Sequence, residues 1–179
     1  HVPSATAGDY DDMLVTLTAA TKTFNLAGLQ NSLIVIPDKT IRARFDAYLK
    51  KIRITPSNPM GYIAVEAAYR GGAAWAKECR RQIYENFELL RDTLAARAPK
   101  AVVSPLEGTY LMWVDLRPSV REQDAVHDLL QKTCRLAVDY GEWFGGDDYV
   151  GFIRLNLATS RENCVRAAER LGDALHALR

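Results

Sequence analysis

In the second half of the chain, 151–157 alternates apolar with polar residues from Ile153 on, and 110–116 is an apolar stretch that would place Tyr110, Met112 and Val114 on one face of a strand and Leu111, Trp113 and Asp115 on the other. This alternation gives a segment one apolar face only if the segment is a β-strand. Helical patterns and short connections surround both stretches. We therefore predict a compact α/β unit with strands over 101–104, 110–116, 135–138 and 151–157 and helices over 121–133 and 161–178.

The first half is predicted to contain strands and helices as well. The β-branched run 13–18 indicates a buried strand, and 33–37 a second one. Helices are predicted over 39–51 and 59–70, with Asn58 as the N-cap. A long helix follows Gly71-Gly72 and ends near Ala98. The side chains expected to face inward are Ile41, Phe45, Tyr48 and Leu49, then Trp75, Cys79, Ile83, Phe87, Leu90 and Leu94, and in the last helix Val165, Ala168, Leu171, Leu175 and Leu178.

Composition narrows the class of protein. With 179 residues and 48% hydrophobic content the chain can bury a sizeable core. A net charge of +1 provides no electrostatic basis for binding nucleic acid or an anionic membrane, and we expect neither partner. Three widely spaced cysteines predict reduced, packed thiols and a cytoplasmic location. The histidines have no ligand spacing, so no metal site is expected.

Lys22 is the first candidate functional residue. It follows the predicted strand 13–18 after small and hydroxyl residues, and an apolar turn comes next. A lysine in that place forms an imine with a carbonyl cofactor if its surroundings lower its pKa. Most lysines at strand ends are simply solvated, and spacing alone leaves both interpretations open.

Arg154 is the second candidate. Alternation places it with Phe152 and Asn156 on one face of the strand 151–157. An arginine in the middle of an apolar strand must reach water or hold an anion, because a buried unpaired charge is too costly. The strand is therefore either an edge strand with Arg154 in solvent, or a strand whose guanidinium grips a carboxylate.

Several motifs carry a resemblance to a known family. Thr21-Lys-Thr-Phe-Asn-Leu-Ala-Gly-Leu-Gln30 resembles the pyridoxal-phosphate (PLP) lysine segment of fold-type I enzymes, in the class I/II aminotransferase-like family. Phe152-Ile-Arg-Leu-Asn156 is similar to that family's C-terminal strand, and Tyr140–Gly146 to its loop beside the substrate entrance. The likeness is greatest to the MalY/PatB group of cystathionine β-lyases (C–S lyases).

The resemblance implies roles for individual residues. Lys22 would hold PLP and act as the catalytic base, Thr21 and Thr18 would bind the cofactor phosphate, and Arg154 would bind the α-carboxylate of a small amino-acid substrate. Ala19 stands where many relatives carry a phosphate-binding hydroxyl, and Gln30 where many aminotransferases carry an arginine. The second difference favours the lyases. A homodimer is also implied.

The resemblance further implies a domain organisation. Family subunits are about twice as long, so we expect the C-terminal half of such an enzyme: the end of the large PLP-binding domain over 1–70, an interdomain helix over 71–98 and the small C-terminal α/β domain over 99–179. The other half would supply several cofactor contacts. We therefore expect this chain to be inactive alone.

The reaction implied is α,β-elimination from sulfur amino acids, giving pyruvate, ammonia and a thiol. Lys22 and Arg154 would serve an aminotransferase equally well, so an amino-acid aminotransferase is the alternative. A non-catalytic module that retains this fold is the second alternative.

Overall fold

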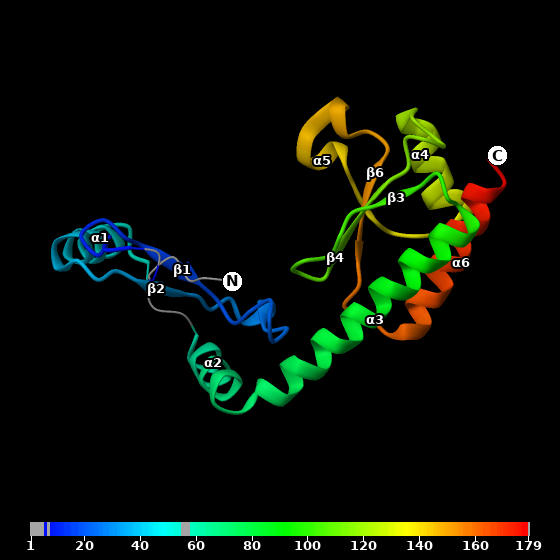
Figure 1. Ribbon diagram of the computed structural model, residues 1–179. Coiled ribbons are helices and arrows are strands. Elements are labelled where there is room, and N and C mark those ends of the chain that lie inside the picture. The colour runs from blue at the N-terminus through cyan, green and yellow to red at the C-terminus, as the bar shows by residue number, and fades with distance from the viewer. Residues whose placement is uncertain (1–5, 7, 55–57, 179) are drawn as a thin grey trace. The chain divides into compact units, whose positions relative to one another are not determined.

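A computed structural model describes residues 6, 8–54 and 58–178. The chain divides into two compact units, His1–Lys77 and Glu78–Arg179, which are described separately below (Figure 1). The three-part division expected from the sequence stays a prediction. Among the described helices, none combines the length and apolar character that crossing a membrane requires.

The first unit contains a two-stranded antiparallel sheet. β1 (Thr16–Thr18) pairs with β2 (Leu33–Val35), so that Thr16 lies opposite Val35. The prediction of a buried strand over 13–18 was wrong in extent and in burial, since Leu17 is 73% exposed. The physical reason is that β1 pairs only with β2 among the described strands, and the sheet's side chains are largely exposed.

Two helices of this unit begin at the predicted residues. Asp38 caps α1 (Lys39–Lys51) by accepting a hydrogen bond from Ile41 N, and Asn58 caps α2 (Pro59–Gly71) in the same way through Gly61 N. Pro59 occupies the first turn, where its missing N–H costs nothing. The prediction that Tyr48 faces inward was wrong, because it lies on the exposed side of α1.

The long helix α3 (Ala73–Arg97) follows directly on Gly72, as predicted. Its apolar stripe is buried only in the C-terminal half, at Phe87, Leu90 and Leu94, whereas the predicted inward residue Trp75 is exposed. The difference follows from the division of the chain, since the buried part of the stripe belongs to the core of the second unit.

The second unit is built on a four-stranded antiparallel sheet of order β3-β4-β6-β5. Its strands are β3 (Val102–Val103), β4 (Leu111–Asp115), β5 (Asp139–Tyr140) and β6 (Phe152–Asn156). The strand predicted over 135–138 was wrong, and the pairing begins only at Asp139. The reason is that Arg135 has a left-handed φ of 53° and Leu136 N donates to the carbonyl of Leu130, so this stretch closes the preceding helix.

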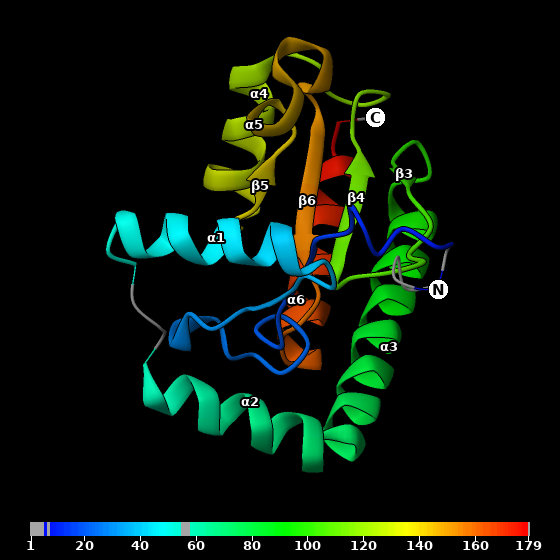
Figure 2. The ribbon, with the colours of Figure 1, turned by 90° about the vertical axis from the view of Figure 1, so that its left-hand side faces the viewer.

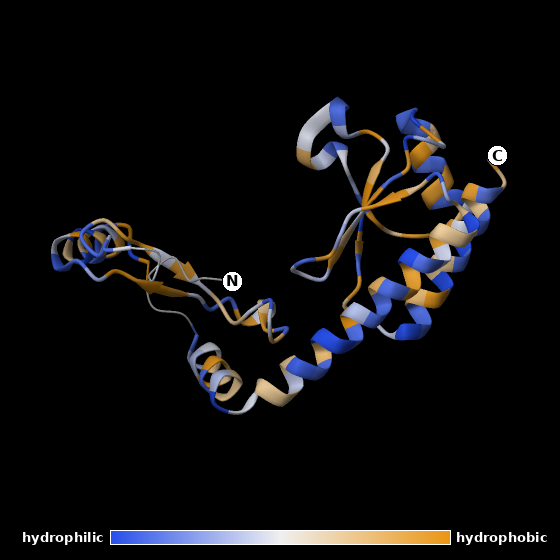
Figure 3. Cartoon of the chain, viewed as in Figure 1, coloured by the Kyte–Doolittle hydropathy of each residue, from blue (hydrophilic) through white to orange (hydrophobic). Residues whose placement is uncertain are grey.

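Helices cover one face of this sheet (Figures 1 and 2). They are α3, α4 (Gln123–Asp128) with its π-helical continuation η3 (Leu129–Thr133), and α6 (Arg161–His176). Strands β4 and β6 are largely apolar in Figure 3, whereas α3 and α6 carry both polar and apolar residues. Val165 is half-buried and Leu178 exposed, so the predicted inward stripe of the last helix was wrong at its end, where α6 has already stopped.

The sheet alternates as predicted. Met112, Val114, Ile153 and Leu155 are buried against the helices. On the opposite face, Arg154 and its neighbours are half-buried, except Asn156 at the end of β6, which is exposed. The predicted α/β architecture is confirmed, with one helical layer on one sheet face.

Candidate active site

Lys22 lies in a turn that leaves the end of β1. Ala20 is buried at the start of this turn, and its carbonyl accepts from Phe24 N at 3.0 Å. The carbonyl of Thr21 accepts from Leu26 N at 2.8 Å, and Asn25 adopts a left-handed φ of 56°, a conformation that asparagine tolerates well. The turn therefore closes on itself through its backbone, with Lys22 exposed at its outer side.

Side chains on both sides of the lysine hold the turn in place. The ring of Phe24 lies 6.0 Å from that of Tyr69 and 6.1 Å from that of Trp75. Further along, Asn58 Nδ2 donates to the carbonyl of Leu29 at 2.7 Å. These contacts attach the segment after Lys22 to α2 and to the first turn of α3, within the first unit.

The polar groups of the turn are available for a ligand. Within the described part of the chain, the side chains of Lys22, Thr21 and Thr18 form no hydrogen bond or ion pair with another residue. Thr21 is half-buried, whereas Thr18 and Lys22 are exposed. The described residues include no cluster of three or more histidine, cysteine or acidic side chains suited to a metal ion. What the turn offers is one amine and two hydroxyls.

Arg154 lies in the second unit, on an interior strand. β6 is flanked by β4 and β5, and the register places Arg154 between Trp113 and Asp139. The edge-strand interpretation was therefore wrong, because both neighbouring positions of the ladder are occupied. Arg154 Nε and Nη2 both donate to Asp139 Oδ2, at 2.9 and 2.7 Å. Of the two options that the sequence left open, water or an anion, the structure shows an anion within the protein, the carboxylate of Asp139.

The short helix α5 (Glu142–Gly145) lies beside this pair. Phe144 places its ring centroid 4.3 Å from Arg154 Cζ and packs edge-on against Trp113. His127 Nε2 and Glu142 Oε1 are 2.7 Å apart, which joins α5 to α4. Gly141 precedes α5, and a Cβ there would lie 2.3 Å from the carbonyl oxygen of Tyr149, so the close approach requires glycine.

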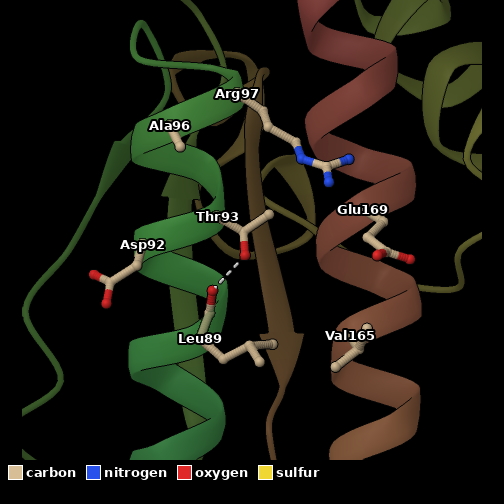
Figure 4. Close-up of a pocket in the computed structure, with 7 residues that line it drawn as sticks. All are labelled: Leu89, Asp92, Thr93, Ala96, Arg97, Val165 and Glu169. Atoms are coloured by element: carbon tan, nitrogen blue, oxygen red, sulfur yellow. Dashed lines mark hydrogen bonds between the residues drawn. The ribbon is translucent and has the colours of Figure 1, made fainter.

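A separate surface groove of about 470 Å³ runs between α3 and α6 (Figure 4). It is lined by Leu89, Asp92, Thr93, Ala96, Arg97, Val165 and Glu169. Thr93 uses its hydroxyl to donate to the carbonyl of Leu89. The two helices cover the sheet face opposite to Arg154, so this groove contains none of the predicted site residues.

The sequence missed two residues of the arginine site. Asp139 was assigned to no element, because the strand was expected to end before it. Phe144 was included only in the segment Tyr140–Gly146, without a role of its own. The sequence carried no signal that singled out Asp139, because the strand pairing that places it opposite Arg154 joins residues 15 positions apart in the chain. Lys22 and Arg154 lie in different units.

Comparison with known proteins gives the following relatives. No protein-family model matches the chain. Cystathionine beta-lyase PatB of Bacillus subtilis (strain 168) is 32% identical over 176 residues, which is 98% of this chain and 45% of that protein. Cystalysin from Treponema denticola, whose structure contains a pyridoxal 5′-phosphate cofactor, superposes with a TM-score of 0.87 at 32% identity, covering 94% of this chain and 43% of its own.

A third relative is the PLP-bound structure of a presumed aminotransferase from Clostridium difficile 630. It superposes with a TM-score of 0.84 at 32% identity, and the match covers 90% of this chain and 41% of the other. The chain thus spans less than half the length of each of these relatives.

The fold is that of the C-terminal part of fold-type I PLP-dependent enzymes, which confirms the predicted fold class. Within that class the chain is homologous to the cystathionine β-lyases and C–S lyases of the MalY/PatB group, as its motifs indicated.

The groups at the lysine turn fit the cofactor of these relatives. PLP carries an aldehyde, which a primary amine captures, and a phosphate, which hydroxyl donors bind. Lys22 provides the amine, and the hydroxyls of Thr21 and Thr18 are uncommitted within the described chain. The amine and the two hydroxyls of the turn therefore match the aldehyde and the phosphate of PLP.

Proposed function

We propose that the protein containing this chain is a PLP-dependent C–S β-lyase that converts sulfur amino acids to pyruvate, ammonia and a thiol. The observation that carries this proposal is that the chain is 32% identical over 98% of its length to a cystathionine beta-lyase. The uncommitted Lys22 amine supports it. A homodimer in the cytoplasm, expected from the sequence, is part of the same proposal.

Each site residue has a definite task. When bound, PLP supplies an aldehyde for covalent attachment and a ring that accepts electrons from the substrate. Lys22 would hold the cofactor through Nζ, and the same atom, once the amine of the substrate has displaced it, would remove the proton from the substrate Cα. Thr21 and Thr18 hold the phosphate. Arg154 binds the substrate α-carboxylate and so orients the Cα–H bond.

An aminotransferase is the second candidate. The presumed aminotransferase from Clostridium difficile 630 is as similar in sequence to this chain as cystalysin is, at 32% identity in both cases. In that reaction Lys22 Nζ would both remove the Cα proton and deliver it again, to an acceptor carbon that PLP would supply. In the lyase the elimination takes place instead. The same residues serve both routes, so only the products distinguish them.

Cofactor attachment is tested by borohydride reduction of the natural protein that contains this chain. After reduction in the presence of PLP, we expect digestion and mass spectrometry to find the cofactor on the Lys22 peptide. Lys22→Ala should abolish the adduct, whereas Lys39→Ala, at an exposed lysine of α1, should leave it unchanged. A folded protein with no adduct would reject the enzyme and support a non-catalytic module.

The reaction itself is tested with cystathionine. Pyruvate formed without an added keto acid supports the lyase. Strict dependence of turnover on a keto acid would instead assign the aminotransferase. We propose that the 179-residue chain alone does not turn over cystathionine, because the relatives are more than twice as long. Turnover by the chain alone at the rate of the natural protein would contradict this.

A further inference from the structure

We propose that Asp139 and Phe144 position the guanidinium of Arg154 so that only its outer edge, Nη1 with Nη2, is presented to a substrate carboxylate. This inference rests on the proposed function, because it concerns how Arg154 performs the role given to it there. Asp139 and Phe144 are thereby positioning residues of the site.

The hydrogen-bond geometry supports this assignment. A guanidinium has five N–H donors, one on Nε and two on each terminal nitrogen. Asp139 Oδ2 accepts from Nε and from Nη2, at 2.9 and 2.7 Å. Two donors on Nη1 and one on Nη2 remain, and Nη1 has no hydrogen-bond partner among the described residues. These remaining donors form the edge that matches the two oxygens of a carboxylate.

The backbone fixes the position of Asp139. It stands directly opposite Arg154 in the antiparallel ladder of β5 and β6. Directly opposite residues of such a ladder bring their Cβ atoms to within about 5.5 Å, so the carboxylate meets the side of the guanidinium nearest the chain. Asp139 therefore does not need to leave when a second carboxylate binds at the outer edge.

Phe144 covers one face of the same group. Its ring centroid lies 4.3 Å from Arg154 Cζ, and Trp113 supports the ring from the neighbouring strand at 5.3 Å. The Arg154 side chain keeps 24% of its exposure. Asp139 occupies the inner edge of the guanidinium and Phe144 covers one face, so the outer edge is the part that neither residue occupies, and this arrangement selects an anion that approaches in the plane of the guanidinium.

The test compares two substitutions of Asp139 in the natural protein with PLP bound. Asp139→Ala removes the acceptor, whereas Asp139→Asn keeps an oxygen that can accept from Nε and Nη2. We expect the alanine variant to raise KM for cystathionine about 10-fold, with kcat changed by less than about 2-fold. The asparagine variant should have a KM much closer to that of the unsubstituted protein. Lys22 trapping by borohydride should remain complete in both.

Two further variants keep the test decisive. Phe144→Ala, at a ring that is 50% exposed, should raise KM by about 2- to 5-fold. Asp173→Asn breaks the similar ion pair with Arg97, between α6 and α3, and should leave KM unchanged. In an Arg154→Lys background, where KM is already raised, Asp139→Ala should raise it little further.

The outcomes separate the two proposals. An unchanged or lowered KM in Asp139→Ala, with Lys22 still trapped, would overturn the positioning role while the proposed function stands. Loss of kcat without a change in KM would do the same. If the unsubstituted protein neither traps PLP nor forms product, the proposed function fails, and this inference fails with it.

Discussion

Asn58 uses both atoms of its side-chain amide, and so couples the start of α2 to the segment that follows Lys22. Its Oδ1 accepts from Gly61 N at 2.8 Å, while its Nδ2 donates to the carbonyl of Leu29 at 2.7 Å. The residue is therefore both a helix cap and an anchor for the lysine turn. Its two functions can be separated by substitution.

We predict that Asn58→Ala lowers the free energy of unfolding by about 1–2 kcal/mol, because the helix cap and the anchor are both lost. Asn58→Asp keeps the cap acceptor and removes only the donor, so it should lose less stability. Urea unfolding of the natural protein measures both changes. If the anchor orders the Lys22 turn, both variants should also bind PLP more weakly. Equal stability of Asn58→Asp and Asn58→Ala would contradict the role of Asn58 as the helix cap.

Asn86 is the polar residue at the centre of the second unit. It is fully buried on α3, and its Nδ2 donates to the carbonyls of Leu157 and Thr159, at 3.0 and 3.1 Å. These bonds join α3 to the connection between β6 and α6.

We predict that Asn86→Ala lowers the free energy of unfolding by about 2–4 kcal/mol, because the buried carbonyl of Leu157 loses this donor, the partly buried carbonyl of Thr159 loses one of its donors, and a cavity forms. Asn86→Asp should lower the free energy of unfolding further, because it buries a negative charge beside two carbonyl oxygens. Thermal unfolding measures the difference. Asn163→Ala, at an exposed position of α6, is the matched control, and a comparable loss there would refute the special role of Asn86.

Asp115 gives the protein a pH-dependent contribution to stability. Hydrogen bonds from the Arg117 guanidinium, at 2.9 and 2.8 Å, lower the pKa of the Asp115 carboxyl from its ordinary value. A lowered pKa in the folded state means that the contribution is complete above the ordinary carboxyl pKa. It is then lost as the pH falls through the lowered pKa.

We therefore predict that Asp115→Asn costs about 1 kcal/mol at pH 7, a modest amount because Arg117 is partly exposed. The cost should shrink as the solution is made strongly acid. Urea unfolding at a series of pH values measures it. In an Arg117→Gln background, Asp115→Asn should leave the free energy of unfolding almost unchanged. A loss of stability that does not depend on pH would contradict the link between the Asp115 pKa and stability.

The cysteines should differ in reactivity. Burial raises the pKa of the Cys134 thiol to about 11 and that of Cys164 in the same direction, and both side chains are buried. Because the thiolate is the reactive form, we predict that iodoacetamide at pH 8 labels these two at least about 100-fold more slowly in the folded protein than in urea. Mass spectrometry of timed samples measures the labelling. Rapid labelling of Cys134 in the folded protein would contradict its burial.

Much of the fold and the identity of the candidate residues followed from local patterns. The cap at Asn58 and the break at Gly72 depend on residues within one turn, and the alternation of 151–157 depends on neighbours along one strand, so both were predictable. The motif around Lys22 likewise indicated the family, because the residues that carry the resemblance are contiguous in the chain.

Tertiary structure decided what the local patterns left open. Whether Leu17 or Trp75 is buried depends on what packs against it, and periodicity carries no such information. The position of Arg154 called for water or an anion, and the ladder that pairs β5 with β6 decided that Asp139 supplies an anion. The sequence by itself thus determined which residues carry charge and where elements begin. Only the folded chain decided which charges meet, because strand pairing joins residues that are distant along the chain.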